Sequence, residues 1–436
     1  MSDYESTLAF LYNQLPFFQR DGQKAYKPGL NTIRSLCSLL DNPQDKYPTI
    51  HIGGTNGKGS TSHMTAAILQ SAGYRVGLYT SPHLKSFTER AKVNGDEMSK
   101  EFVVSFVEKY KGMMLDFRPS FFEWTLLMTF SYFAEQKVDI AIIEVGLGGR
   151  FDSTNIIHPL VSLITNIGLD HTDILGHTKA EIAFQKAGIF KPNTTALVVD
   201  VLPETRNVFE EVGKSQEANV VFLKDTIYID NNWRVNIHFN MVEFMLNDSF
   251  RDKKFTLNCG LVGEYQRDNL IGVYGLFQFL NESTRFKIPE VSFRKGLEEV
   301  TKLTKLKGRW QCLGENPLII ADTGHNSHAF EEHNLFFSKW NERHLHFVLG
   351  FMRDKDADSI IKLLPSKSHF YFCEIPSNFR SCTKDELARL GERHGLNYDV
   401  FSDVNELLTH LQGSLGEDDF IFVGGSTFLV AELNSL

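Results

Sequence analysis

The stretch HIGGTNGKGSTSHM, residues 51–64, carries four glycines and one lysine between two segments of different character. Before it, residues 49–52 read as a short apolar strand, and after it residues 60–72 have the composition of a helix. Gly54 and Gly57 allow the backbone to curl so that successive N–H groups face inward, and the positive end of the following helix adds to this effect. The stretch therefore predicts an anion-binding loop.

The side chains at the end of this loop indicate phosphate as the anion. Lys58 supplies a mobile cation for the β- and γ-phosphates of a nucleotide, and Ser60 or its neighbour can reach the accompanying Mg²⁺. The strict pattern GxxxxGK[ST] is not met, because Ile52 stands at its first position and Gly59 interrupts its Lys-Ser pair. An ordinary strand-to-helix turn needs fewer glycines and no such lysine, so nucleotide binding is the favoured interpretation.

Acidic and histidine side chains follow two later strands. Glu144 lies near the end of the apolar run 139–145. Asp170 and His171 come just past the next strand. Since the carboxyl ends of strands in a doubly wound sheet line the ligand crevice, Glu144 is expected beside the phosphate loop, where a carboxylate can hold Mg²⁺. Two plainer alternatives stay open: Glu144 pairs with Arg150, or His171 is a packed, hydrogen-bonding residue.

A lysine also stands in an apolar setting. Lys186 lies in the helical stretch IAFQKAGIFKP, which stops at Pro192. Taken alone, such a lysine usually extends its apolar stem so that the charged end reaches solvent. A nearby acid such as Glu181 is the other plain partner for it.

The elements that must position these residues alternate between strand and helix from about residue 47 to 190. Continuous apolar strands separated by amphipathic helices indicate a parallel sheet covered on both faces. From about residue 196 to 258, apolar and polar residues alternate, which predicts a small antiparallel β elaboration before a helix over 266–280. The predicted strands are 49–52, 75–79, 139–145 and 161–165, the predicted helices include 100–115 and 124–135, and the antiparallel runs are 220–223, 233–239, 242–246 and 253–258.

A second alternating block starts near Pro317. None of its predicted strands is followed by GxGxxG, so no dinucleotide site is expected there. The charged stretch TKLTKLKGR, residues 301–309, separates the two blocks and is the predicted hinge. The predicted strands of this block are 318–321, 344–349, 369–373 and 420–423, with a helix over 384–394.

Composition limits the class of protein. The 436 residues suggest two or three domains on a prior of roughly 150 residues each. A net charge of −9 disfavours a broad nucleic-acid surface, and the apolar runs fall far short of the ~20 residues that span a bilayer. The five cysteines are scattered, and the N-terminus carries no secretory signal. We therefore expect a cytoplasmic protein with neither nucleic-acid nor membrane partners.

An ordered set of motifs resembles one family along nearly the whole chain. GTNGKGST, the TSPHL…FTER loop, IIEVGLGGRFDSTN and ITNIGLDHTDILG…FQKAGIFKP are similar to motifs of folylpolyglutamate synthase and dihydrofolate synthase. These enzymes are ATP-dependent ligases akin to the Mur ligases of cell-wall synthesis. LKGRWQ, ADTGHNSH, GFMRDKD and the terminal GGSTFLV continue the resemblance. The phosphate loop alone is moderately specific, whereas the ordered set is very specific.

The resemblance implies an α/β fold with an N-terminal P-loop doubly wound domain over 1–300, which includes the antiparallel elaboration. A hinge linker over 301–309 joins it to a smaller Rossmann-like α/β domain over 310–436, and ATP binds between the two. It also implies two Mg²⁺ sites. The ATP-binding residues implied are Gly54, Thr55, Asn56, Gly57, Lys58, Gly59, Ser60, Asn269, Arg309, Asp322 and His325; the metal ligands are Ser60, Glu144, His171 and Lys186, the lysine as a carbamate; the catalytic residues are Lys58, His171 and Lys186; and Ser81, Pro82, His83 and Arg90 border the pterin substrate.

Three motifs depart from the family pattern. Tyr265 replaces the histidine of HQxxN, and Lys307 replaces the proline of PGR. Asp322 opens DTGHNS, which ends in Ser327, where the family has DGAHNP. The aspartate, histidine, asparagine and arginine expected to meet ligand are all present. These departures affect the backbone of the loops and remove any contact that the family histidine would make.

The activity implied is amide formation from an unactivated carboxylate. ATP phosphorylates the carboxylate of dihydropteroate or a reduced folate, and the amine of L-glutamate attacks the acyl phosphate. SPHL resembles the versions that both make dihydrofolate and extend folates, so the bifunctional interpretation is favoured, and a monomer is expected. A Mur ligase of cell-wall synthesis is a rival, but only about fifty residues precede the loop, too few for its extra domain. A low-turnover nucleotide switch is another, but it would not need Glu144, His171 and Lys186 together.

Overall fold

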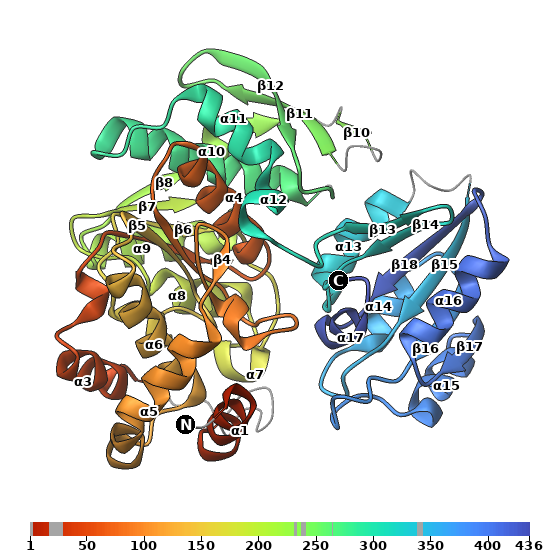
Figure 1. Cartoon of the computed structure of the whole chain (residues 1–436). Helices are drawn as coiled ribbons and strands as arrows, with labels where there is room; N and C mark the ends of the chain where they lie inside the picture. Colours follow the sequence, from red (N-terminus) through yellow and green to blue (C-terminus); the bar gives the residue numbers. More distant parts are fainter. Residues whose placement is uncertain (1–2, 17–28, 231–232, 237–240, 264, 338–342) are drawn as a thin grey trace. The chain divides into compact units, whose positions relative to one another are not determined.

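The computed structural model describes the whole chain except residues 1–2, 17–28, 231–232, 237–240, 264 and 338–342. Two compact units make up the chain (Figure 1). The predicted limits of the two domains stay a prediction. The two units interleave along the chain between residues 231 and 267. The first unit comprises Met1–Asp230, Met245–Phe255 and Asp268–Lys305, and the second comprises Asn231–Phe244, Thr256–Arg267 and Leu306–Leu436.

An eight-stranded sheet in the order β4-β3-β2-β5-β1-β6-β7-β8 is the core of the first unit. The six strands from β2 to β8 in this order run parallel, and β3 and β4 form an antiparallel edge. Every residue of β1 and β5 is buried, as expected for parallel strands covered on both faces. The strands are β1 (Thr49–Gly53), β2 (Val76–Tyr79), β3 (Ala91–Val93), β4 (Asp96–Glu97), β5 (Ile140–Glu144), β6 (Val161–Ile164), β7 (Thr195–Val198) and β8 (Asn219–Phe222).

Helices cover both faces of this sheet. On one face, α4 packs on β1, β2 and β5, and Gly272 of α10 lies against Leu163 of β6. On the other face, apolar side chains of α5 and α6 enclose Ile143, and those of α8 and α9 enclose Ile164. The helices of this unit are α1 (Tyr4–Gln14), α3 (Asn31–Leu39), α4 (Lys58–Ser71), α5 (Lys100–Phe117), α6 (Phe121–Glu135), α7 (Thr172–Leu175), α8 (Lys179–Ala187), α9 (Pro203–Ser215), α10 (Gln266–Ser283), α11 (Glu290–Glu298) and α12 (Val300–Thr304).

One prediction for this region is wrong. The run 220–223 was expected in the antiparallel elaboration, but it falls in β8, which pairs in parallel with β7 and completes the main sheet. Exposed and half-buried residues alternate along β8 because it is an edge strand, and this imitates the alternation of an antiparallel sheet. The parallel sheet thus continues past residue 190, where the predicted alternation of strand and helix stops.

The antiparallel elaboration does form, over a shorter range. Its four strands have the order β10-β11-β12, with β9 also paired to β11. β11 pairs antiparallel with both β9 and β10, which confirms the predicted character. Residues 237–239 of one predicted run lie outside the described residues. The strands are β9 (Ile227–Ile229), β10 (Arg234–Asn236), β11 (Met241–Asp248) and β12 (Lys253–Cys259).

The second unit is built on a six-stranded sheet in the order β13-β14-β18-β15-β16-β17. β13 is antiparallel to β14, and the other neighbours are parallel. The four predicted strands of this block are confirmed, and the two edge strands, β13 and β17, are additional. The elements are β13 (Gln311–Glu315), β14 (Leu318–Ala321), β15 (His344–Leu349), β16 (His369–Cys373), β17 (Asn397–Phe401), β18 (Asp419–Gly424), α13 (Ser327–Phe337), α14 (Ala357–Leu363), α15 (Lys384–Arg393), α16 (Val404–Ser414) and α17 (Thr427–Glu432).

Both sheets confirm the predicted α/β class, with helices on both faces of the first one. Within the described part of the chain, every helix is too short or too polar to cross a membrane.

Candidate active site

The predicted phosphate loop connects β1 to α4, and two of its glycines are required by close contacts. Gly54 has φ +144°, and a Cβ there would lie 1.9 Å from Oγ1 of Thr165. Gly57 has φ +80°, and a Cβ there would lie 2.0 Å from Oδ1 of Asn269. Only glycine fits such backbone conformations at such distances. The loop is therefore packed between the end of β6 and α10.

The loop backbone is fastened to the segment that follows β6. The amide of Thr55 donates to the carbonyl oxygen of Asn166 at 3.1 Å, and the amide of Asn56 donates to Oδ1 of Asn166 at 2.9 Å. Oγ1 of Thr165 donates to the carbonyl oxygen of Asn56 at 2.6 Å. The amides of Thr55 and Asn56 thus support the loop itself, which differs from the expected inward-facing row. The positive end offered to an anion is the N-terminus of α4, which starts behind Gly57.

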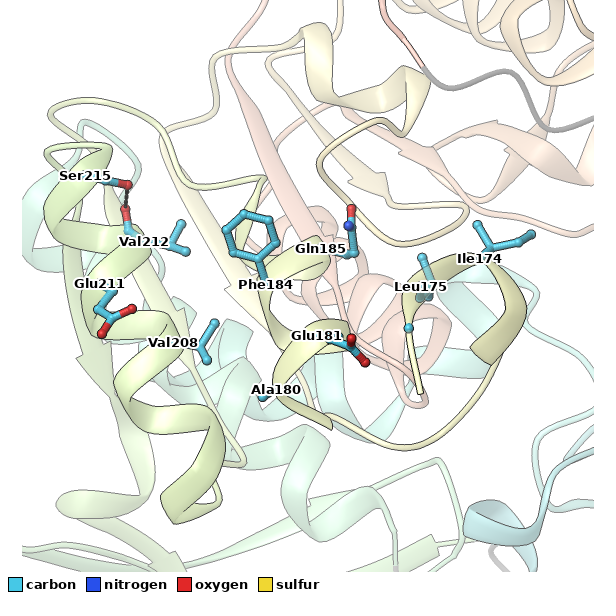
Figure 2. A pocket seen from close by; sticks show the side chains of 11 residues that line it. Ile174, Leu175, Ala180, Glu181, Phe184, Gln185, Val208, Glu211, Val212 and Ser215 are labelled. Atoms are coloured by element: carbon cyan, nitrogen blue, oxygen red, sulfur yellow. Dashed lines mark hydrogen bonds between the residues drawn. The ribbon is translucent and has the colours of Figure 1, made fainter. Parts of the chain in front are cut away.

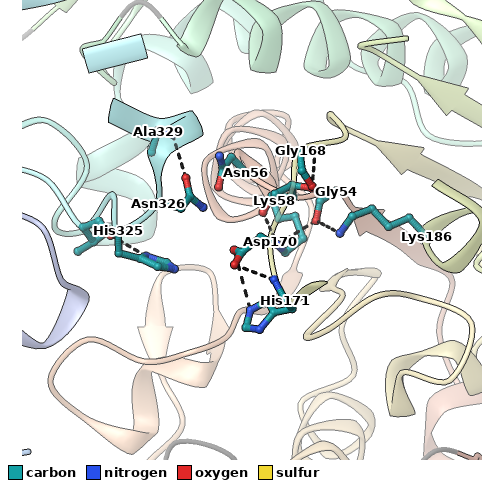
Figure 3. A network of polar contacts seen from close by, with 12 residues as sticks. Gly54, Asn56, Lys58, Gly168, Asp170, His171, Lys186, His325, Asn326 and Ala329 are labelled. Atoms are coloured by element: carbon teal, nitrogen blue, oxygen red, sulfur yellow. Dashed lines mark hydrogen bonds and ion pairs between the residues drawn. The ribbon is translucent and has the colours of Figure 1, made fainter. Parts of the chain in front are cut away.

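Two lysines meet at one carbonyl group of this loop. Nζ of Lys58 donates to the carbonyl oxygens of Gly54 at 3.1 Å and Thr55 at 2.9 Å. Nζ of Lys186 donates to the same Gly54 oxygen at 2.7 Å (Figure 3). Lys186 is 4% exposed. Burial and the nearby Lys58 charge lower the pKa of Lys186 to about 7, against the opposing effect of Asp170.

The interpretation in which the charged end of Lys186 reaches solvent is thereby excluded. Its other expected partner, Glu181, makes its hydrogen bonds to other residues. The carboxylate of Glu181 accepts hydrogen bonds from the amides of His177 and Thr178 and from the Thr178 hydroxyl, as a cap of α8. Lys186 therefore faces the phosphate loop and not the acid on its own helix.

Glu144 lies where the strand order predicts. It is the last residue of β5 and pairs with Ile52 of β1. Ile52 lies two residues before the loop glycine Gly54. Its side chain is buried, and Oε2 accepts a hydrogen bond from the amide of Ser81 at 2.9 Å. The guanidinium of Arg150 lies over the rings of its neighbours on the surface instead. Glu144 thus contacts the predicted substrate loop from a strand end that neighbours the strand leading into the phosphate loop.

His171 stands at the start of α7 in a left-handed conformation, with φ +51°. Its amide donates to Oδ1 of Asp170 at 2.9 Å, and its Nε2 lies 4.0 Å from Oδ2 of the same residue. Figure 3 shows this pair beside Lys58 and the Gly54 carbonyl. Histidine is among the non-glycine residues that adopt positive φ more readily, so this conformation carries little strain.

The predicted substrate loop is fixed at both ends. Arg90 is buried, its Nε donates to Nδ1 of His83 at 2.8 Å, and its guanidinium lies 5.4 Å from the centre of the Phe121 ring. Burial, together with the Arg90 charge, lowers the pKa of His83 well below its ordinary value. His83 is therefore neutral, and since Nδ1 accepts, its proton lies on Nε2.

The second unit gathers its predicted residues around Asp322, at the end of β14. Oδ2 of Asp322 accepts hydrogen bonds from the Trp310 amide at 2.8 Å and the Tyr265 hydroxyl at 3.0 Å. Oδ1 accepts from the Gly324 amide at 2.7 Å and pairs with Nε2 of His333 at 3.0 Å. Each carboxylate oxygen thus has two donors, which fills the places a carboxylate offers.

This carboxylate holds together the two segments that carry the predicted ATP contacts of this unit. Arg309 is next to Trp310, and His325 is next to Gly324, so each follows or precedes an amide fixed by Asp322. Burial alone raises the pKa of Asp322, but the nearby His333 and Arg309 outweigh it and bring the pKa to about 2. Asp322 is therefore ionised at neutral pH.

The residues that fasten the site were not foreseen. Thr165 and Asn166 follow β6 in ITNIG, and their signal was polar side chains directly after an apolar strand. His333 lies inside α13 and Tyr265 replaces an expected histidine. Their contacts with Asp322 join positions far apart in the sequence, which no local pattern reveals.

A surface pocket between α8 and α9 is separate from these residues (Figure 2). Its lining includes Phe184, Leu175 and Val208, with Glu181 and Glu211 as acidic members. It therefore lies on the part of α8 away from Lys186, and none of the predicted ligand-binding residues lines it.

The chain is similar to known proteins over nearly its whole length. Residues 52–277 match the Mur ligase middle domain, and residues 308–427 match the Mur ligase glutamate ligase domain. The dihydrofolate synthase/folylpolyglutamate synthase of Bacillus subtilis is 30% identical over 444 residues, covering 99% of this chain and 98% of that protein.

Two solved structures are also similar over nearly the full length. E. coli FolC in complex with DHPP and ADP is 29% identical with a TM-score of 0.82, covering 99% of this chain and 96% of that one. A bifunctional folylpolyglutamate synthase/dihydrofolate synthase from Yersinia pestis, complexed with AMPPNP and Mn ion, is 27% identical with a TM-score of 0.82, covering 99% and 97%. The chain therefore belongs to the dihydrofolate synthase/folylpolyglutamate synthase family, within the Mur ligases.

Proposed function

We propose that this chain is an ATP-dependent ligase that joins L-glutamate to the carboxylate of dihydropteroate and of reduced folates, giving ADP and phosphate. The observation that carries the proposal is the meeting of Lys58 and Lys186 at the Gly54 carbonyl, beside Glu144, which contacts Ser81 of the substrate loop. Cationic and acidic groups for phosphoryl transfer thus lie next to a loop suited to an organic substrate. The DHPP, ADP and AMPPNP bound by the similar E. coli and Y. pestis proteins support it.

The reaction has two steps. A carboxylate oxygen of the substrate attacks the γ-phosphorus of ATP, the bond to the β–γ bridging oxygen breaks, and ADP leaves. The amine of glutamate then attacks the acyl carbon, phosphate leaves with the C–O bonding electrons, and the nitrogen loses a proton. Lys58 and the N-terminus of α4 stabilise the charge that develops on the transferred phosphoryl group.

A divalent metal belongs to this proposal, and the residues present fit Mg²⁺. Glu144 offers carboxylate oxygens and Ser60 a hydroxyl, the hard donors that Mg²⁺ prefers. Over the residues that the structure describes, no three His, Cys, Asp or Glu side chains form a ready-made metal site. This suits an ion that keeps several waters and is completed by nucleotide phosphates. When bound, the metal offsets charge on the phosphoryl oxygens. We assign a second metal to His171 and Lys186.

The remaining ATP contacts are proposed in both units. Asn269 lies against Gly57 of the phosphate loop, within the first unit. Arg309 and His325 belong to the second, where Asp322 fixes their segments. Because its four hydrogen-bonding places are filled, we assign Asp322 to organising these segments more than to touching ATP. Closure of the units on ATP would also exclude water from the readily hydrolysed acyl phosphate.

Phosphate release with different acceptors tests the function. With ATP and glutamate present, we expect release with dihydropteroate and, separately, with a reduced folate, because the SPHL loop resembles the bifunctional enzymes. Release with a reduced folate alone would assign the extending activity only. ADP formation that is independent of glutamate would contradict the ligase and favour a nucleotide switch. Release with neither acceptor, but with a cell-wall precursor, would favour a Mur-type substrate.

Replacing the central carboxylate of the second unit should impair both folding and turnover. Asp322→Asn puts an amide NH₂ where two donors now point, so we expect a loss of about 1–3 kcal/mol in the free energy of unfolding. Urea unfolding measures this loss, and we expect kcat to fall at saturating ATP and glutamate. The matched control is Asp354→Asn, whose exposed side chain pairs with Arg380 at 3.5 Å and should change stability little. Unchanged stability and activity of the Asp322 variant would contradict the assignment.

A further inference from the structure

Lys92 is a buried lysine outside the residues considered above. It is the middle residue of β3, which pairs with β2 and β4. The residue is 4% exposed, and its Nζ donates to the carbonyl oxygens of Thr304 at 3.0 Å and Lys305 at 3.2 Å. A buried ammonium group is costly unless it is hydrogen-bonded, so these contacts determine where the side chain points. Lys92 thus ties an edge of the main sheet to a distant part of the chain.

The segment that Lys92 holds is the end of α12. The last carbonyl groups of a helix lack partners within it and carry partial negative charge, so a cation stabilises them. The cap residue of α12, Lys305, has φ +52°, a conformation for which glycine is the usual residue. This short helix therefore ends at a residue whose conformation is unfavourable for a lysine.

The turn of the β3–β4 hairpin adds to this support. Gly95 has φ +81°, and a Cβ there would lie 2.1 Å from the carbonyl oxygen of Leu303. Asp96, the next residue, pairs with Nζ of Lys305 at 2.7 Å. Together with Lys92, the hairpin thus contacts three successive residues at the end of α12.

The contact between the hairpin and the end of α12 lies at a boundary between the two units along the chain. Lys305 is the last residue of the first unit, and after it the chain crosses into the second unit for the last time and stays there. Arg309, a proposed ATP contact, follows four residues later. In the other direction, Arg90 ends the substrate loop two residues before Lys92. One three-residue strand therefore connects the substrate loop to the point where the chain leaves the first unit for the last time.

We propose that Lys92 is a positioning residue, which fixes this exit point so that the second unit moves about a fixed pivot after residue 305. The inference rests on the proposed function, in which Arg309 must reach ATP when the units close. With Lys92 in place, closure turns the short segment that follows Lys305 and leaves α12 intact. Without it, α12 can unwind and the position of Arg309 varies. A misplacement of about 1 Å at a reacting group can cost about 100-fold in rate.

Lys92→Met tests the anchor without reference to activity. Methionine keeps much of the side-chain length but removes the donor. We expect hydrogen exchange at the amides of residues 300–309 to speed up at least about 10-fold, with residues 49–71 unchanged. Lys92→Arg, which keeps a donor, should restore slow exchange. The matched control is Lys302→Met, the same change at an α12 lysine whose side chain is 76% exposed. Exchange that rises equally over the whole first unit would show general destabilisation and overturn the proposal.

Kinetics of the same variants tests the role in catalysis. Below the unfolding transition we expect Lys92→Met to lower kcat at least about 10-fold, with ADP affinity within about twofold of the wild type because the phosphate loop is intact. Full kcat in this variant would overturn the positioning role. If the variant does not fold, Gly95→Ala, which pushes the turn off the Leu303 carbonyl, should give the same selective loss. A wild-type protein without ligase turnover would refute the proposed function, while the exchange result would still decide whether Lys92 anchors α12.

Discussion

Lys58→Ala is expected to lower kcat for glutamate-dependent ADP formation at least about 100-fold, the loss typical of removing one strong transition-state contact. Nζ of Lys58 lies at the Gly54 and Thr55 carbonyls, at the start of α4, where a bound nucleotide would draw it to the phosphates. The side chain is only partly buried and these contacts are within its own loop. We therefore expect the unfolding midpoint to change little.

Lys100→Ala is the matched control for this experiment. Lys100 is also the first residue of a helix in the first unit, but it is exposed and lies over the ring of Tyr4. Its replacement should leave kcat and stability close to wild type. Near-wild-type ADP production by the Lys58 variant would refute the assignment of the loop to phosphate. Loss of activity together with a large drop in the unfolding midpoint would instead assign Lys58 to the fold.

The sequence predicted the parallel core well because burial on both faces leaves a strong local signal. The apolar runs that form β1, β5 and β6 were placed to within two residues at each end. The signal fails at sheet edges, where one side of a strand meets solvent. β8 therefore resembled an antiparallel strand, and the β3–β4 hairpin, β13 and β17 were not predicted. The interior strand β7 was also missed, because the predicted alternation of strand and helix stopped before it.

The candidate site was predictable to the extent that its residues follow strands. Glu144 lies beside the phosphate loop because parallel strands end at one edge, which is a property of the fold class. How the loop is fastened was not predictable. Asn166 takes the Thr55 and Asn56 amides, which the glycine pattern had suggested for the anion. Whether a backbone amide binds a ligand or supports the loop depends on a contact with a residue more than a hundred positions away in the sequence.

In the second unit too, the sequence predicted the site residues but not the contacts that hold them. The DTGHNS motif located Asp322 and His325, but only the folded chain reveals that Tyr265 and His333 complete the shell of the carboxylate. The departure from the family histidine at position 265 thus acquires a physical meaning, since the tyrosine hydroxyl donates to Asp322. A motif identifies which residues matter, whereas the packing decides what each one touches.

Lys186 supports the second prediction with a large expected effect, that its side chain is N-carbamylated in the active enzyme. Its Nζ shares the Gly54 carbonyl with Lys58, so two ammonium groups would lie close together in a buried place. Burial and that neighbour bring the pKa of Lys186 to about 7. A substantial fraction of the amine is therefore neutral near neutral pH. A neutral amine can attack CO₂, forming an N–C bond and releasing a proton, which replaces a repelled cation by a carboxylate suited to Mg²⁺.

The sign of the pH dependence follows from the lowered pKa. Because the neutral fraction of Lys186 rises as the pH passes upward through about 7, capture of CO₂ should increase in the same direction. We expect activity after removal of bicarbonate to fall, and its restoration by added bicarbonate to be greater at about pH 8 than at about pH 6. ¹³C NMR with labelled bicarbonate should show one carbamate signal that is absent from Lys186→Ala. Equal activity with and without bicarbonate across this range would contradict the prediction.

Lys186→Ala separates a ligand-forming lysine from a merely buried one. We expect kcat to fall at least about 100-fold, and added acetate or another short carboxylate to restore part of it by occupying the vacated ligand position. Lys191→Ala is the matched control, since Lys191 is half-buried, also has its pKa lowered, to about 8, and also donates to a carbonyl oxygen, that of Asn155, at 2.8 Å. Its carbonyl partner lies outside the phosphate loop, so its loss should bring no rescue by carboxylates. If Lys186→Ala remains active, or if acetate rescues neither variant and the wild-type protein shows no carbamate signal, the lysine serves only as a hydrogen-bond donor to Gly54.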